Sequence, residues 1–320
     1  MSAKSGGVSL SQHAGFGHVI HSGEPIMHPL RHLTAILLLL AGLIALPGTV
    51  RSETYDTCAG FIDSLPATIS TQGTWCLRQN LSTAISSGNA ITIATNNVTI
   101  DCNDFKLGGL AAGVATTAIG VYSDTRLNTT IRNCTIRGFK HGIRLDGDGA
   151  GHLVESNRLD NNTFNGIFVR GDSSIIRRNL IVDTGGIPDS FGLYAIYTYY
   201  DVDILDNTIN NVVATNGSSD AVVGIYTVSN NTGTISGNRV RGLASDVPVS
   251  YLTRAIVVSP QTSRVTVRGN DLYGPGDGTG VSCPSYLGST VLVRDNVING
   301  FATGIGHCAN SGGNSIVNAP

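Results

Sequence analysis

The sequence predicts an all-β protein that folds as a single-domain right-handed parallel β-helix of about eight or nine coils behind a short N-terminal cap. A short apolar motif recurs along most of the chain, and Gly, Asn, Asp and Ser separate its copies. No window between residues 91 and 320 has the period of a crossover helix. Parallel strands at this period must therefore stack as coils about 4.8 Å apart.

The composition agrees with this fold, because 40 of the 320 residues are glycine and only 13% are charged. The formal net charge is −2 and there is no basic run, so we expect no nucleic-acid partner.

The first repeated motif is a small residue, Gly or Ala, followed by Ile, or by Val in two copies. It returns every 22 to 31 residues, beginning at Gly120, Gly142, Gly166, Ala195, Gly224, Ala255, Gly280 and Gly304. Strand alternation then places the Ile and Val side chains inside the solenoid, where they stack as aliphatic columns.

An asparagine before a second apolar strand forms the other repeated motif. We expect these amides to stack at a turn, each bonded to the amide above and below. The predicted members are Asn103, Asn133, Asn157, Asn179, Asn207, Asn238, Asn270 and Asn296. A leucine-rich repeat would need the LxxLxLxxN spacing, and a β-propeller would need WD or kelch motifs, neither of which is present.

The N-terminal segment predicts export. Residues 33–46 form an uncharged apolar run of signal-peptide length, preceded by Arg31 and followed by small residues that favour cleavage after Ser52. We expect residues 1–52 to be an extension and signal peptide, with Met27 as the natural start. The run is too short to span a bilayer comfortably, although a short membrane anchor stays open. The mature protein would be secreted or periplasmic, with no membrane contact.

The mature chain divides into three predicted segments. Residues 53–90 form an N-terminal cap with a short helix near residues 77–86. Residues 91–308 form the repeats, and residues 309–320 form a polar C-terminal tail.

An even number of cysteines in an exported chain favours disulfides over metal ligands, and no CxxC or Cys/His cluster competes. Six cysteines allow 15 pairings. We favour pairs between neighbouring segments of the solenoid, which are Cys58–Cys76, Cys102–Cys134 and Cys283–Cys308.

From about residue 90 onward the chain resembles the right-handed parallel β-helix, or pectate-lyase-like, superfamily, and its GI and N-x-I motifs resemble the generic repeat proteins of that group. That superfamily contains lyases, hydrolases, epimerases and non-catalytic binding proteins, so the resemblance is specific for fold and weakly specific for function. It implies a substrate groove along the strands that follow each Gly-Ile motif.

Two outward columns follow from strand alternation after that motif. Their aromatic faces suit sugar rings, and their charged groups suit carboxylates and hydroxyls. The first column contains Tyr122, Arg144, Phe168, Tyr197, Tyr226 and Val257, and the second contains Asp124, Asp146, Arg170, Tyr199, Val228 and Ser259. The aromatic residues could equally be surface residues that favour β-structure.

Asp124 and Asp146 are the candidate acid pair of a glycoside hydrolase, because like charges on adjacent coils would raise the pKa of one carboxyl. Asp148 and Asp172 are further candidates. The alternative is ordinary turn formation, since residues 146–149 spell DGDG.

Elimination on a uronate is a second possible chemistry, in which Arg144, Arg170 or a Ca²⁺ ion on the aspartates neutralises the carboxylate. Lys140, Tyr122 or an arginine would remove the proton. The alternative is a structural lattice of ion pairs, Asp124–Arg144 and Asp146–Arg170. Polygalacturonase and pectate-lyase motifs are missing, and His141 is interpreted as a turn residue.

These observations predict an exported protein that binds, or binds and cleaves, an extracellular or cell-wall polysaccharide. A non-catalytic structural or adhesion solenoid is the alternative. Assembly of a periplasmic metal centre is disfavoured, because the sequence has no His/Met/Cys cluster. Whether the protein is an enzyme, which substrate it takes and its oligomeric state stay open.

Overall fold

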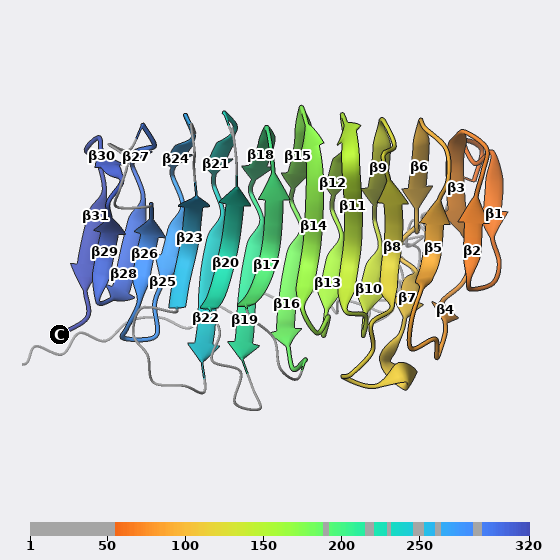
Figure 1. The fold of residues 1–320 in the computed structure, drawn as a ribbon, viewed down its shortest axis with the longest axis horizontal. Helices are drawn as coiled ribbons and strands as arrows, with labels where there is room; N and C mark the ends of the chain where they lie inside the picture. Colours follow the sequence, from red (N-terminus) through yellow and green to blue (C-terminus); the bar gives the residue numbers. More distant parts are fainter. Residues whose placement is uncertain are drawn as a thin grey trace, which may run out of the picture. The chain divides into compact units, whose positions relative to one another are not determined.

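The computed structural model describes residues 55–187, 192–214, 221–228, 232–245, 253–259, 264–283 and 290–320. These residues form a right-handed solenoid of parallel strands, and the chain advances along its axis from one end to the other (Figure 1). The predicted signal peptide, residues 1–52, lies outside the described residues. Among the described residues no helix is long and apolar enough to cross a membrane.

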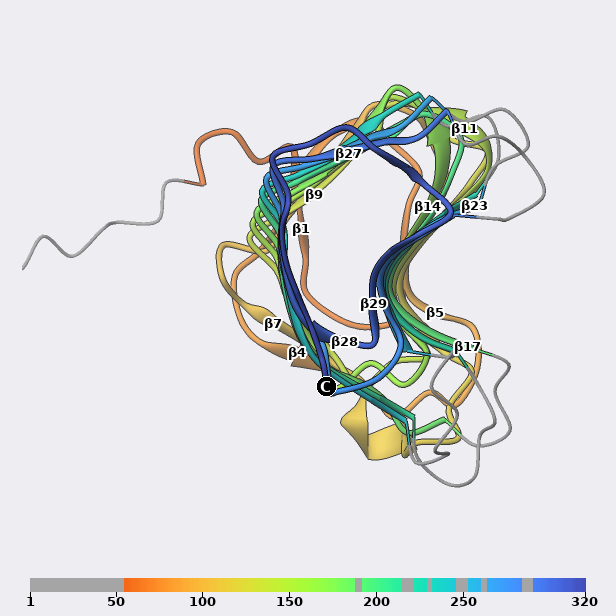
Figure 2. The same ribbon diagram turned by 90° about the vertical axis from the view of Figure 1, so that its left-hand side faces the viewer.

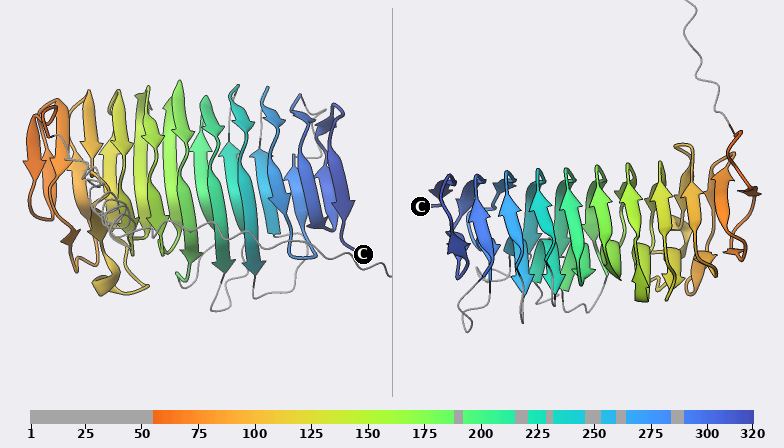
Figure 3. Two further views of the ribbon diagram at one scale, coloured as in Figure 1. Left: turned by 180° about the vertical axis from the view of Figure 1, so that it is seen from behind. Right: turned by 90° about the horizontal axis from the view of Figure 1, so that it is seen from above.

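Three parallel sheets, which we name A, B and C, form the walls of the solenoid. Sheet A has eleven strands, and sheets B and C have ten each. Each coil passes through sheet B, then sheet A, then sheet C, and its strands pair with those of the coils before and after it (Figure 3).

Sheet A consists of β1 Gly60–Ile62, β3 Gly73–Leu77, β6 Val98–Asp101, β9 Thr129–Arg132, β12 Leu153–Glu155, β15 Ser174–Arg177, β18 Val202–Leu205, β21 Thr234–Ser236, β24 Thr266–Arg268, β27 Leu292–Arg294 and β30 Ala309–Asn310. Sheet B consists of β2 Ala67–Ile69, β5 Asn89–Ile93, β8 Ile119–Asp124, β11 His141–Ala150, β14 Asn165–Asp172, β17 Gly192–Tyr199, β20 Ala221–Val228, β23 Thr253–Ser259, β26 Thr279–Ser282 and β29 Thr303–Gly306. Sheet C consists of β4 Leu81–Ser82, β7 Lys106–Gly108, β10 Thr135–Arg137, β13 Arg158–Asp160, β16 Leu180–Gly185, β19 Thr208–Ala214, β22 Arg239–Ser245, β25 Asp271–Tyr273, β28 Val297–Phe301 and β31 Ser315–Asn318.

The described chain forms ten coils rather than eight or nine, because the strands extend beyond both ends of the predicted repeats. In the segment predicted as a cap, β2, β3 and β4 already make a coil. Its predicted helix near residues 77–86 is absent, since Leu77 and Leu81 lie on strands with their side chains buried in the core. The predicted tail instead contributes β30 and β31. In the described chain the helical segment is a single short 3₁₀ turn, Leu110–Ala112.

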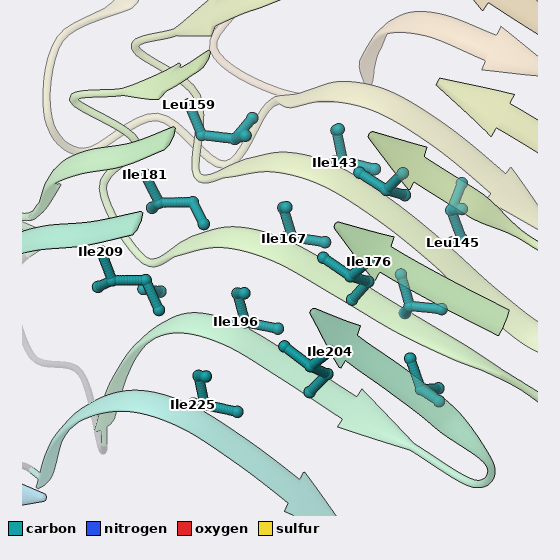
Figure 4. Packing of buried hydrophobic residues seen from close by; sticks show 14 of the residues in the cluster. Ile143, Leu145, Leu159, Ile167, Ile176, Ile181, Ile196, Ile204, Ile209 and Ile225 are labelled. Carbon is teal, nitrogen blue, oxygen red and sulfur yellow. The ribbon is translucent and has the colours of Figure 1, made fainter. Parts of the chain in front are cut away.

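Aliphatic columns fill the interior, as the first motif predicts. Ile143, Ile167, Ile196 and Ile225 pair in register across four neighbouring coils, and none has exposed surface (Figure 4). Burying one such side chain is worth roughly 1.5–3 kcal/mol. Stacking of like residues therefore stabilises each interior coil from both sides.

The second motif forms a buried ladder between sheets A and C. The side-chain amide of Asn207 donates to Oδ1 of Asn238 at 3.0 Å and to the carbonyl of Ile176 at 3.0 Å. The same pattern repeats through Asn157, Asn179, Asn207, Asn238, Asn270, Asn296 and Asn314.

Two predicted members are not part of the ladder. Asn103 donates to the carbonyl of Leu77 and Asn133 donates to Oδ1 of Asp101. Both have a positive φ, so they occupy the left-handed turn position beside the ladder rather than the ladder itself.

All three favoured disulfides are present, namely Cys58–Cys76, Cys102–Cys134 and Cys283–Cys308. The described chain has no free cysteine. Three disulfides indicate that the protein matures in an oxidising compartment.

Sheet B curves inward, which makes its outer face concave when the solenoid is viewed along its axis (Figure 2). The small residue of the first motif explains the curvature. A Cβ on Gly142 would point toward the core and meet Leu159 Cδ1 at 2.9 Å and the carbonyl oxygen of Gly166 at 2.7 Å. Since Ile143 also points inward, two consecutive residues face the core and the strand bends there.

Candidate functional site

The concave face of sheet B carries both predicted outward columns. Tyr122, Arg144, Phe168, Tyr197 and Tyr226 pair in register across five neighbouring strands, from β8 to β20. The second column also starts in register, because Asp124 pairs with Asp146. Arg170 and Tyr199 pair two coils further along.

A β-bulge interrupts the second column between β11 and β14. Leu145 pairs with Val169 and Gly149 pairs with Gly171, so Asp146, Gly147 and Asp148 together face Arg170 alone. Strand β11 continues through this segment, and the turn expected from the DGDG sequence is therefore not formed. Bulges of this kind change the direction of side chains and are frequent near functional sites.

The bulge allows Arg144 and Asp146 to pair within one strand. The guanidinium of Arg144 donates to Oδ2 of Asp146 at 2.6 Å and 3.0 Å, and the backbone N–H of Gly147 donates to Oδ1 at 2.9 Å. Burial acts to raise the pKa of Asp146, but these hydrogen bonds and the charges of Arg144 and Arg170 hold the pKa below its ordinary value. Asp146 is thus ionised, contrary to the raised pKa expected for a hydrolytic acid.

Arg170 has partners other than those of the predicted ion-pair lattice. Its guanidinium donates to the hydroxyl of Tyr200 at 2.9 Å and lies 3.5 Å from Asp148, whose side chain is 82% exposed. It also lies over the rings of Tyr199 and Tyr200, 5.9 Å and 5.4 Å from their centroids. The Asp124–Arg144 and Asp146–Arg170 bridges are therefore not formed, and Arg170 keeps a weak carboxylate partner.

Next to Arg170 lies an aromatic cluster. Phe168 meets Tyr197 edge-on at 5.3 Å, and Tyr197 lies within 5.1 Å of both Tyr199 and Tyr226. Tyr194, which the sequence analysis did not single out, completes the cluster 4.9 Å from Tyr197. We call Phe168, Tyr194, Tyr197, Tyr199 and Tyr226 the aromatic cluster.

The hydroxyls of Tyr197 and Tyr199 are 2.6 Å apart and share a hydrogen bond. Burial, followed by that hydrogen bond, raises the pKa of Tyr197 far above its ordinary value. The ring is therefore neutral and held in place by its neighbours.

A cavity of about 450 Å³ opens beside the cluster. We call it the arginine pocket, and it is lined by Arg144, Asp146, Phe168, Arg170, Tyr199 and Tyr200. Five of the nine predicted catalytic or substrate-binding residues line this pocket, whereas Tyr122 and Asp124 lie on β8, in the coil before it.

Tyr122 and Asp124 occupy the N-terminal part of the same face. Burial, followed by the charges of Asp124 and Asp146, raises the pKa of Tyr122, so its phenol is a poor base. Asp124 is exposed, and its side chain makes no hydrogen bond or ion pair with other described residues.

The residues present fit a Ca²⁺ ion poorly. Both carboxylate oxygens of Asp146 already accept hydrogen bonds, from Arg144 and Gly147, whereas Ca²⁺ takes six to eight oxygen ligands. In the part of the chain that is described, no three His, Cys, Asp or Glu side chains are grouped to hold a metal ion.

His141 lies on strand β11 and is not the turn residue expected from the sequence. It is 5% exposed and packs edge-on against Phe164 at 5.4 Å, and its Nδ1 has no hydrogen-bond partner among the described residues. Burial, with the charges of Arg144 and Lys140, lowers its pKa to about 3. Asn165 pairs with it in register on the next coil and is fully buried. Within the described part of the chain, neither polar atom of the Asn165 side chain has a hydrogen-bond partner.

The concave face therefore carries a third column, which the two repeated motifs do not predict. It lies one residue before each Gly or Ala of the first motif, and its register neighbours are Ile119, His141, Asn165, Tyr194, Val223, Arg254, Thr279 and Thr303. The bend at the small residue brings this column next to the first one, which strict alternation does not predict.

Comparison with known proteins identifies the family. Residues 69–186 and 117–319 match the family described as "Right handed beta helix region". The chain belongs to this family. No curated protein matches the chain.

Two solved structures are similar to this family member. The A-module of the mannuronan C-5 epimerase AlgE6 from Azotobacter vinelandii is 11% identical with a TM-score of 0.47, over 83% of this chain and 92% of that one. The catalytic domain of a GH87 alpha-1,3-glucanase, solved in complex with tetrasaccharides, is 12% identical with a TM-score of 0.37, over 80% of this chain. The match spans 63% of the glucanase chain. At such identities the similarity concerns the fold alone.

Proposed function

We propose that this protein is exported and binds an extracellular polysaccharide along the concave face of sheet B. The observation that carries the proposal is the aromatic cluster next to Arg170, on a curved outer face that already contains a cavity of about 450 Å³. Tyrosine combines an apolar ring, which packs on the apolar face of a pyranose, with a hydroxyl that bonds sugar hydroxyls.

The rings are arranged before any ligand arrives. Tyr197 contacts four other aromatic rings and shares a hydrogen bond with Tyr199. Side chains held in this way lose little conformational entropy on binding, which favours affinity. Cross-strand stacking alone would also stabilise the sheet, so the binding role has to be tested separately.

The charge of Arg170 favours an acidic polysaccharide as the ligand. Arg144 is already neutralised by Asp146 at 2.6 Å, whereas the carboxylate nearest to Arg170 is the exposed Asp148 at 3.5 Å. A uronate carboxylate could replace Asp148 and form a two-pronged hydrogen-bonded pair with the guanidinium.

The side chains of the site are better suited to bind a polysaccharide than to cleave it. The ionised, arginine-bound Asp146 is unsuited to protonate a leaving group, and Tyr122 and Tyr197 are held protonated. Cleavage of the bound polysaccharide is therefore a separate proposal, to be decided by product formation. The alternative function, a solenoid that binds the polysaccharide without cleaving it, would use the same groove.

The test measures binding of the purified protein to polygalacturonate, alginate, xylan and dextran by isothermal titration calorimetry. New reducing ends and the absorbance of unsaturated products would be followed in parallel. Arg170→Gln should weaken binding of the acidic ligands roughly tenfold or more, because a hydrogen bond to a charged group is worth about 1.5–3 kcal/mol. Arg268→Gln, on the outer face of sheet A, is the matched control. Absence of binding to all four polysaccharides by folded protein would overturn the proposal.

A further inference from the structure

A second cavity lies further along the concave face. It has a volume of about 430 Å³ and lies at β20, β23, β26 and β29, toward the C-terminal end of the solenoid. Its polar lining includes Tyr226, Arg254, Thr279, Ser282, Thr303 and His307.

Arg254 is the charged group of this cavity. It is half-buried in β23, where it pairs in register with Val223 and Thr279. Within the described part of the chain its guanidinium makes no ion pair or hydrogen bond, and none of the residues that line the cavity is acidic. A guanidinium without a counter-charge, surrounded by hydroxyls and an imidazole, is suited to bind an anionic group.

The second cavity and the arginine pocket share one surface. Tyr226 belongs to the aromatic cluster and also lines the second cavity. Arg170 on β14 and Arg254 on β23 are separated by β17 and β20, so they are three coils apart in sheet B. At about 4.8 Å per coil this separation is about 14 Å along the axis.

We infer that one acidic polysaccharide bridges the two cavities, with one carboxylate at Arg170, another at Arg254 and the sugar residues between them on the aromatic cluster. This inference rests on the proposed function and specifies its ligand. The ligand is a polymer with anionic groups on more than one residue, and the full affinity requires a chain long enough to reach both arginines. Two linked contacts bind more tightly than either alone, because the second contact is intramolecular.

The experiment compares short and long oligomers of one uronic acid by isothermal titration calorimetry. Galacturonate disaccharide and octasaccharide serve as probes, and a neutral xylose octasaccharide is the uncharged control. We expect the wild-type protein to bind the acidic octasaccharide at least tenfold more tightly than the disaccharide. Arg254→Gln and Arg170→Gln should each abolish this length advantage. Arg268→Gln, on sheet A of the same coil as Arg254, should preserve it.

The outcomes separate this inference from the function on which it rests. If Arg254→Gln keeps the full length advantage, or if the xylose octasaccharide binds as tightly as the acidic one, the bridging inference is wrong while polysaccharide binding stands. If the folded wild-type protein binds none of the oligosaccharides, both fail. Thermal unfolding of each variant confirms that the fold is intact. Arg254→Gln should unfold close to wild type, because the Arg254 guanidinium makes no hydrogen bond or ion pair with the described residues.

Discussion

Cys134 donates its backbone N–H to Oδ1 of Asn157 at 3.0 Å, as Asn157 itself donates to Asn179. The disulfide Cys102–Cys134 therefore adjoins the buried asparagine ladder at its N-terminal end. Covalent and hydrogen-bonded links between coils thus follow one another along a single edge of the solenoid.

A central member of the ladder should be far more important for stability than a surface asparagine. Asn207→Ala leaves the backbone N–H and side-chain amide of Asn179 without their acceptor, in a site without solvent. We expect a loss of roughly 2–5 kcal/mol in the free energy of unfolding, measured by urea denaturation. Asn299→Ala, on the exposed face of β28, should change it by less than about 0.5 kcal/mol. Equal effects of the two substitutions would show that the ladder adds no stability.

Removal of the Cys102–Cys134 disulfide tests the adjoining covalent link. It joins residues 32 apart, and the chain-entropy estimate for a loop of this length is about 3–4 kcal/mol. The double substitution of both cysteines by serine should lower the free energy of unfolding by this amount in urea denaturation. A loss below about 1 kcal/mol would mean that the ladder alone fixes these coils.

Acid should destabilise the fold through His152. This imidazole is 2% exposed, its Nδ1 accepts a hydrogen bond from the N–H of Thr129, and burial lowers its pKa to about 4. In the unfolded chain a histidine titrates near pH 6.5. Between pH 6.5 and 4 the unfolded state therefore binds a proton that the folded state does not bind. His152 alone should lower stability by roughly 2–4 kcal/mol between pH 6.5 and 4, in addition to the contribution of His141, as measured by unfolding at a series of pH values. His152→Gln should reduce this slope, and an unchanged slope would contradict the assignment.

Gly142→Ala tests the origin of the concave face. The added Cβ would lie 2.7 Å from the carbonyl oxygen of Gly166 and 2.9 Å from Leu159, so the strand has to move. Overpacking of this kind costs about 1–3 kcal/mol, to be measured by thermal unfolding. Gly306→Ala, where a Cβ would be no closer than 3.4 Å to any neighbour, is the control and should unfold near the wild-type temperature.

Periodic features of the sequence predict most of the fold. The spacing of the Gly-Ile motif identifies the strands of sheet B and the residues that stack within it, because one residue per coil repeats in register. The first coil was missed because residues 60–82 have short strands and no such motif. Asn133 was misassigned because Cys134 holds the ladder position in that coil.

The site could be predicted only where alternation holds. Tyr197 and Tyr226 follow it and lie on the outer face as predicted. The bulge at Gly147, by contrast, lets Arg144 and Asp146 pair with each other instead of with the predicted partners on the neighbouring coils. No periodic signal marks a bulge, because it depends on the backbone register between two particular strands. Arg254 was missed for a related reason, since the bend before each Ile brings a further residue onto the concave face.

The stacking of independent coils has a consequence for how the protein could be altered. Every interior coil contacts the coil before and the coil after it through the same three strands, the same aliphatic column and, over most of the length, the same amide. Duplication or deletion of one whole coil would therefore preserve the neighbours of each remaining coil. It would lengthen or shorten the concave face of sheet B by about 4.8 Å at a time. Natural variation or engineering could thus change the length of the proposed binding face in discrete steps, without designing a new core.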